Sequence, residues 1–232
     1  MEFLVVLACS VVAVCLLRNA MMRVPIVFYV LACATVVLLF AGSSGLLGAW
    51  WRPVILLVQR CMVALALFVI VMFIGVFPKE SKVGSWLRPI RAELSIIAWI
   101  LCIGHMCSYA VPYAQRAFSG TMSLSMAIAF WVAVALFALL LVLGITSFGV
   151  VKKRMRTTTW KMVQRSAYVF FALVYVHMVL MLAPAAVAGG VQAQISIAMY
   201  TAVFLAYAIL RLRRAFLASG LSRNAYIILD KV

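Results

Sequence analysis

Two histidines are the residues of this chain whose type and placement could do chemistry. His105 and His177 are its only histidines, and each lies within a long apolar stretch. An ionisable side chain at membrane depth is costly and by default marks a functional site. Neutral imidazole is a common ligand of haem iron, so imidazoles from two facing helices could hold one haem. The alternative is that each histidine is a packing residue bonded to a neighbouring carbonyl or hydroxyl.

The composition defines the class of protein that must position these side chains. Hydrophobic residues make up 69% of the 232 residues and charged residues only 10%. Soluble domains are about half apolar and about a quarter charged, so we predict an all-α integral membrane protein. The net charge of +16 does not indicate a nucleic-acid partner, because the basic residues lie in short loops between apolar segments. Membrane lipid is the expected surrounding.

Seven apolar segments are candidates for transmembrane helices, which need about 20 residues each. They span 3–17, 24–47, 53–77, 92–114, 122–148, 160–183 and 194–210. We therefore expect a bundle of about seven helices, or six if the short first segment is cleaved or lies in the interface. The expected organisation is N-terminal transmembrane helices over 1–87, a haem-binding core over 88–183, and a last helix with a short cytoplasmic tail over 184–232.

The charges in the loops orient these segments. With seven spans, 17 of the 20 basic residues fall on one side of the membrane. Basic loops face the cytoplasm, so we expect a multi-pass protein of the plasma or inner membrane with its N-terminus outside and its C-terminus cytoplasmic.

This orientation places both histidines at a similar depth. At 1.5 Å per residue, His105 lies about 21 Å along its helix from Arg91, and His177 lies about 18 Å beyond Arg165. Both imidazoles then fall in the outer half of the bilayer, which favours a shared haem.

A sequence pattern in the second half of the chain resembles a known family. Thr146-Ser147 is followed by a basic run over 152–156, then by Trp160, Gln164-Arg165, Tyr168 and finally His177. The run 91–98 leads in a matching way to His105. Over about 88–182 the chain resembles the ferric-reductase-like transmembrane domain, and within it the haem-b membrane subunit of the bacterial periplasmic methionine sulfoxide reductase system.

The resemblance implies one haem b with His105 and His177 as its axial ligands. The family places a further histidine where this chain has Gln164, and glutamine is not a usual haem ligand. The inner half of the bundle would then hold a flavin (FMN or FAD) or a quinone. Residues that could line this inner cofactor site are Trp99, Trp160, Gln164, Arg165, Arg91 and Glu93. The alternative is that the tryptophans and arginines are ordinary interfacial anchors.

Arg60 is a further charge inside an apolar segment. A guanidinium binds carboxylates in a bidentate manner, so Arg60, helped by Arg116, could bind a haem propionate. The alternative is that Arg60 extends to the outer surface.

The functional expectation is a transmembrane b-type cytochrome. It would pass electrons from a cytoplasmic flavin or quinol donor to an acceptor on the outer face. A partner oxidoreductase or flavoprotein on one face would complete the electron path. A haem-free transporter with histidines lining its path, or an assembly protein without a cofactor, remains the alternative.

Overall fold

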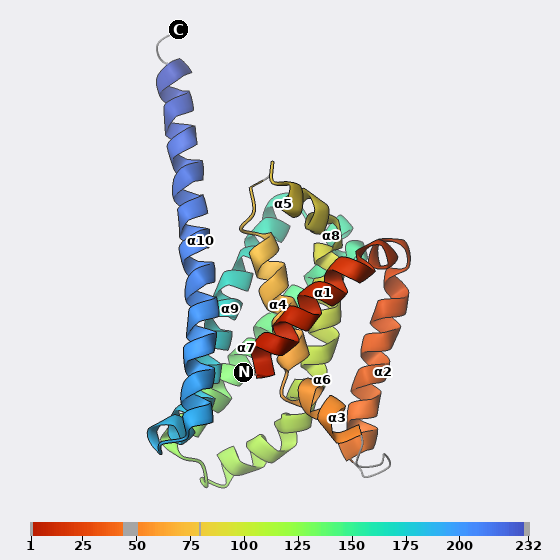
Figure 1. The fold of residues 1–232 in the computed structure, drawn as a ribbon, viewed down its shortest axis with the longest axis vertical. Coiled ribbons are helices and arrows are strands. Elements are labelled where there is room, and N and C mark those ends of the chain that lie inside the picture. Colours follow the sequence, from red (N-terminus) through yellow and green to blue (C-terminus); the bar gives the residue numbers. More distant parts are fainter. Residues whose placement is uncertain (1, 44–50, 79, 230–232) are drawn as a thin grey trace.

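Helices form the architecture of the chain, as shown in Figure 1. The computed structural model describes residues 2–43, 51–78 and 80–229. Its helices are α1 (Glu2–Arg23), α2 (Pro25–Ser43), α3 (Arg52–Gln59), α4 (Met62–Ile74), α5 (Lys82–Leu87), the 3-10 helix η2 (Arg88–Ile90), α6 (Arg91–Phe118), α7 (Leu124–Ser147), α8 (Gly149–Arg154), α9 (Thr157–Val187) and α10 (Val191–Leu229).

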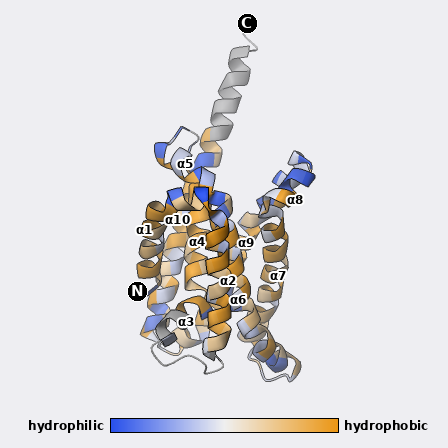
Figure 2. Ribbon diagram, turned by 90° about the vertical axis from the view of Figure 1, so that its right-hand side faces the viewer, coloured by the Kyte–Doolittle hydropathy of each residue, from blue (hydrophilic) through white to orange (hydrophobic). Residues whose placement is uncertain are grey.

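The bundle has the dimensions and surface of a membrane protein. Among the described residues, six helical stretches are long and apolar enough to cross a bilayer: α1, α2, the run from α5 through α6, α7, α9 and α10. Figure 2 shows these apolar helices between more hydrophilic ends, where α5 and α8 mark one end and α3 lies at the other. The prediction of an all-α, multi-pass membrane bundle is confirmed.

Helix α4 lies at the centre of the bundle. Nine of its 13 residues are buried, which leaves almost no face of this helix for lipid. It packs against α1 on one side and α6 on another. Its uninterrupted apolar sequence therefore reflects contact with protein on all sides, whereas α1, α2 and α7 expose large apolar side chains of the kind that face lipid.

The predicted single span over 53–77 is wrong, because the chain breaks between α3 and α4. Helix α3 ends at Gln59, with Arg60 as its C-cap residue. The next residue, Cys61, takes a left-handed backbone conformation with φ of 59°. No other described non-glycine residue has a positive φ. Neither glycine nor proline marks this break in the sequence, so nothing in the local residue types announces it.

Two glycines set the close approach of α6 to its neighbours. A Cβ atom at Gly104 would lie 2.8 Å from Val36 Cγ2 of α2, and one at Gly144 of α7 would lie 2.0 Å from Trp99 Nε1. Glycine is thus required for α2 and α7 to approach α6 as closely as they do. The predicted ends of two spans are also corrected, since α6 continues past Pro112 to Phe118 and α9 continues past Pro184 to Val187.

Candidate functional site

His105 is held by the break between α3 and α4. Its Nδ1 lies 2.6 Å from the backbone oxygen of Gln59, the last residue of α3. A carbonyl oxygen only accepts, so Nδ1 carries the proton and donates it. Because α3 ends at Gln59, this carbonyl is not bound by an amide of a following helical turn and is available to a side chain.

His177 of α9 makes the equivalent contact with a backbone carbonyl of α7. Its Nδ1 donates to the backbone oxygen of Ala129 at 3.1 Å. Ala129 lies in the second turn of α7, near the loop that follows α6. Both histidines therefore occupy the half of the bundle that contains α3 and the α6–α7 connection.

The two bonds leave the same atom of each ring available. With Nδ1–H donated to a carbonyl, Nε2 is unprotonated and can ligate a metal. A carbonyl or carboxylate on the far ring nitrogen is the usual partner of metal-binding histidines, because it fixes the ring and the tautomer. Helix α7 packs against both α6 and α9, the helices that carry His105 and His177. The donor set fits axial ligation of a haem iron, and the ligand assignment itself stays a prediction.

Arg60 lies near this region, at the surface of the bundle. Its side chain is 53% exposed, and Nη1 lies 3.5 Å from the carboxylate of Glu2. The prediction that it binds a haem propionate is not tested by this contact. A role in binding would require the guanidinium to leave or share its ion pair with Glu2.

Gln164 and Trp160 of α9 form hydrogen bonds with the C-terminal end of α7. The Gln164 amide nitrogen donates to Thr146 Oγ1 at 3.0 Å, and Trp160 Nε1 donates to the Thr146 carbonyl at 3.0 Å. Lys152 Nζ lies over the Trp160 ring, 4.6 Å from its centroid. Thr146 is itself buried. At the position for which the sequence resemblance implies a histidine, this chain therefore forms a side-chain hydrogen bond between helices.

The other residues predicted for an inner cofactor site lie in different places. Trp99 packs on Gly144 and Phe148, and its buried Nε1 finds no hydrogen-bond partner within the described part of the chain. Glu93 accepts a hydrogen bond from Tyr29 of α2. Arg165 is exposed on α9. Arg91 lines a separate cavity at the basic end of the bundle.

Two features of the interior were missed by sequence reasoning. The Sγ atoms of Cys61 and Cys102 lie 3.8 Å apart, one helical turn from His105 on α6. The cavity that contains Arg91 also takes residues from α10, namely Tyr207, Arg211 and Arg214. Their spacing of four and three residues places them on one helix face, and this periodicity was the available signal.

The comparisons with known proteins bear on this arrangement. A family model for the ferric reductase like transmembrane component matches residues 60–175. The match includes His105 and Gln164, and it ends two residues before His177.

One relative is an "Uncharacterized protein" of Treponema pallidum (strain Nichols). It is 35% identical over 205 residues, which cover 88% of this chain and 54% of that protein. The chain thus spans about half the length of this relative. No solved structure matches the chain. Because the family model covers half of the sequence, the chain belongs to the ferric reductase like transmembrane component family.

Proposed function

We propose that this chain is a membrane cytochrome that passes electrons through one haem b held by His105 and His177. The observation that carries the proposal is the pair of hydrogen bonds from Nδ1 to the carbonyls of Gln59 and Ala129, which leaves Nε2 of both rings free to bind iron. Membership of a family that typically binds haem supports the same conclusion.

The residues of this chain would position the cofactor and set its surroundings. A haem iron ligated by two imidazoles supplies reversible one-electron transfer. The Nδ1–H donations hold both rings in one orientation and increase the electron density at Nε2. Leu101 and Cys102, buried on the turn of α6 before His105, exclude water on that side. Exclusion of water and low polarity around the iron tune its reduction potential.

Gln164 favours a single haem. Glutamine is not a usual ligand of haem iron, and its amide is already bonded to Thr146. We infer that the donor at the inner end is a flavin or a quinol, and that the acceptor lies on the outer face. This is the arrangement expected of the haem-b subunit of the periplasmic methionine sulfoxide reductase system, with a partner oxidoreductase or flavoprotein on one face.

The test is a dithionite-reduced minus oxidised visible spectrum of detergent-purified protein, with haem quantified per chain. We expect one haem per chain with low-spin b-type bands. His105→Ala and His177→Ala should each abolish bound haem, while Gln164→Ala should leave the haem-to-protein ratio unchanged. Circular dichroism and size exclusion would establish that each variant is folded.

Other outcomes would identify a different protein. Full haem retention in either folded histidine variant would reject the ligand assignment. Two haems per chain would show that the inner position is occupied despite Gln164. A colourless wild-type protein, and no reconstitution with added haem, would leave a haem-free transporter or assembly protein.

A further inference from the structure

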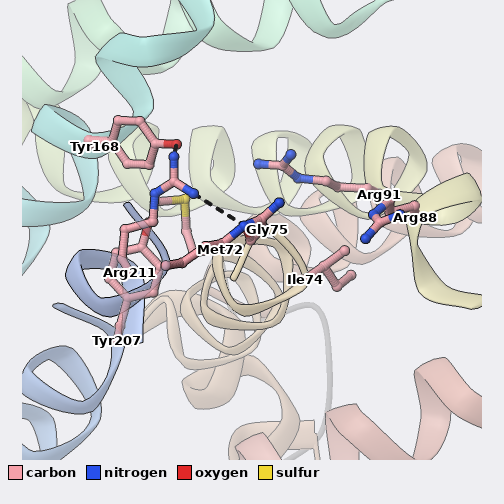
Figure 3. A pocket seen from close by; sticks show the side chains of 9 residues that line it. Met72, Ile74, Gly75, Arg88, Arg91, Tyr168, Tyr207 and Arg211 are labelled. Atoms are coloured by element: carbon pink, nitrogen blue, oxygen red, sulfur yellow. Dashed lines mark hydrogen bonds between the residues drawn. The ribbon is translucent and has the colours of Figure 1, made fainter. Parts of the chain in front are cut away.

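A cavity at the basic end of the bundle gathers four arginines. Its volume is about 220 Å³, and its polar lining consists of Arg88, Arg91, Arg211, Arg214, Tyr168 and Tyr207. Figure 3 shows side chains from α6, α9 and α10 around the end of α4. Residues more than 100 positions apart in the sequence meet here, so the cluster forms only in the tertiary fold.

Two of the guanidinium groups donate to the carbonyl that caps the C-terminal end of α4, and a third lies close to the same residue. Arg211 and Arg214 both donate to the backbone oxygen of Gly75, the C-cap of that helix. Arg91 Nη2 lies 3.6 Å from the position that a Cβ atom at Gly75 would take. The three guanidinium groups therefore lie together around Gly75.

Tyr168 completes one wall of the cavity. The Arg211 guanidinium lies over its ring at 4.9 Å from the centroid and also donates to its hydroxyl oxygen. Because this oxygen accepts from Arg211, the hydroxyl proton of Tyr168 is free to be donated elsewhere. Phosphate oxygens accept such bonds.

The charge of three of the cavity arginines is not balanced by a carboxylate. No carboxylate lines the cavity, and Arg91, Arg211 and Arg214 form no ion pair with a carboxylate among the described residues. The C-terminus of α4 supplies only about half a negative charge. Cations held this close repel one another unless an anion lies between them, so the geometry is that of an incomplete ion pair.

We propose that this cavity binds the phosphate group of an anionic ligand. The planar fork of a guanidinium matches the geometry of phosphate oxygens and binds them in a bidentate manner. The phosphate would be either the headgroup of an anionic phospholipid or an ester from the aqueous phase. The inference does not depend on the haem assignment, since neither His105 nor His177 is among the lining residues of the cavity.

The first arm of the test uses soluble probes on the detergent-purified full-length chain. FMN and riboflavin share one ring system and differ in the phosphate, so their dissociation constants isolate its contribution. For an aqueous phosphate ester we expect FMN to bind at least about ten-fold more tightly than riboflavin. Inorganic phosphate at constant ionic strength should then compete with FMN.

The second arm tests the lipid source by native mass spectrometry of protein taken from phosphatidylglycerol or phosphatidylcholine nanodiscs. Selective retention of about one phosphatidylglycerol per chain would identify the lipid headgroup as the ligand. In either arm, Arg211→Gln/Arg214→Gln should remove the preference for phosphate. Arg213→Gln is the matched control, because Arg213 is exposed on the same helix and lies outside the cavity.

Two results would overturn the proposal. One is the absence of any phosphate preference in both arms. The other is an equal loss of binding in Arg213→Gln, which would indicate general surface charge. Should the double variant fail to fold, Tyr168→Phe removes a single donor and should weaken phosphate binding several-fold. A normal haem spectrum in these variants would separate this result from the proposed function.

Discussion

At the scale of the residue, buried Thr146 connects α7 to α9 through hydrogen bonds. It accepts from Gln164 through its side chain and from Trp160 through its carbonyl, and its own hydroxyl donates to the Val142 carbonyl at 2.7 Å. The Gln164 side chain thus fills a structural role between α7 and α9. Its removal should affect stability without affecting haem content.

Gln164→Ala is therefore predicted to lower the free energy of unfolding by about 1 kcal/mol, the usual net contribution of a hydrogen bond. Thermal unfolding in detergent, followed by the visible absorbance and by circular dichroism, would measure the change. Gln192→Ala is a suitable control, because Gln192 is exposed on α10. A large loss of haem in a folded Gln164 variant would contradict the structural role.

Arg60 and Glu2 allow a second test at the same scale. Both side chains are more than half exposed, so their ion pair should contribute less than about 1 kcal/mol. If Arg60 instead binds a propionate, Arg60→Leu should lower the haem midpoint potential, because a nearby cation favours the reduced, less positive haem. Glu2→Gln should leave the cation in place and not produce that decrease. Equal potentials in the wild type and Arg60→Leu, measured by redox titration, would assign Arg60 to the surface.

At the scale of the element, helix α6 depends on two glycines in its contacts. Gly144→Ala would place a methyl group 2.0 Å from Trp99 Nε1. We therefore expect overpacking to lower the free energy of unfolding by about 1–3 kcal/mol. Gly149→Ala is the control, since nothing lies within 4 Å of a Cβ at that position. The double variant Gly144→Ala/Trp99→Leu should recover part of the loss, and purely additive effects would show that the two sites do not interact.

At the break between α3 and α4, we expect the relative stability of glycine and alanine variants to be the reverse of that inside a helix. Alanine is more stable than glycine inside a helix by about 0.5–1 kcal/mol. At Cys61, with φ of 59°, Cys61→Gly should instead be more stable than Cys61→Ala by about 1 kcal/mol. The same pair of substitutions at Cys102, within α6, should show the ordinary order. Thermal unfolding of the four variants tests the break, and an ordinary order at both positions would contradict it.

At the scale of the whole molecule, the two ends differ in charge. Arg18 donates to the Trp86 carbonyl at 2.7 Å and stacks on that ring, which joins the end of α1 to α5. The four arginines of the cavity lie at this basic end, while Arg60 and Arg116 lie toward the other. Under the positive-inside rule, this asymmetry predicts that the C-terminus lies in the cytoplasm.

Reporter fusions would test that orientation in a bacterial host. Green fluorescent protein at the C-terminus should fluoresce, and alkaline phosphatase at the same point should be inactive. Alkaline phosphatase inserted at Gly120, in the turn between α6 and α7, should be active because that loop is predicted to face outward. The reverse pattern would invert the topology and the direction of electron flow.

The class of fold could be predicted from the sequence alone, because hydropathy is averaged over whole segments and does not depend on single residues. It also singled out His105 and His177, since ionisable residues are rare at membrane depth. The break at Cys61 could not be predicted, because a left-handed residue without glycine is stabilised by tertiary contacts. The arginine cavity could be predicted only in part: the spacing of Tyr207, Arg211 and Arg214 places them on one helix face, but Arg211 and Gly75 are 136 residues apart and meet only in the folded bundle.

The division of the third segment also has a consequence for biosynthesis. Thirteen residues of α4 rise about 20 Å, which is less than the hydrocarbon thickness of about 30 Å. The polar group exposed at the break, the Gln59 carbonyl, meets its His105 partner only 46 residues later in the chain. We therefore expect α3 and α4 to remain in the translocation channel until α6 has been synthesised, and these helices to enter the bilayer together.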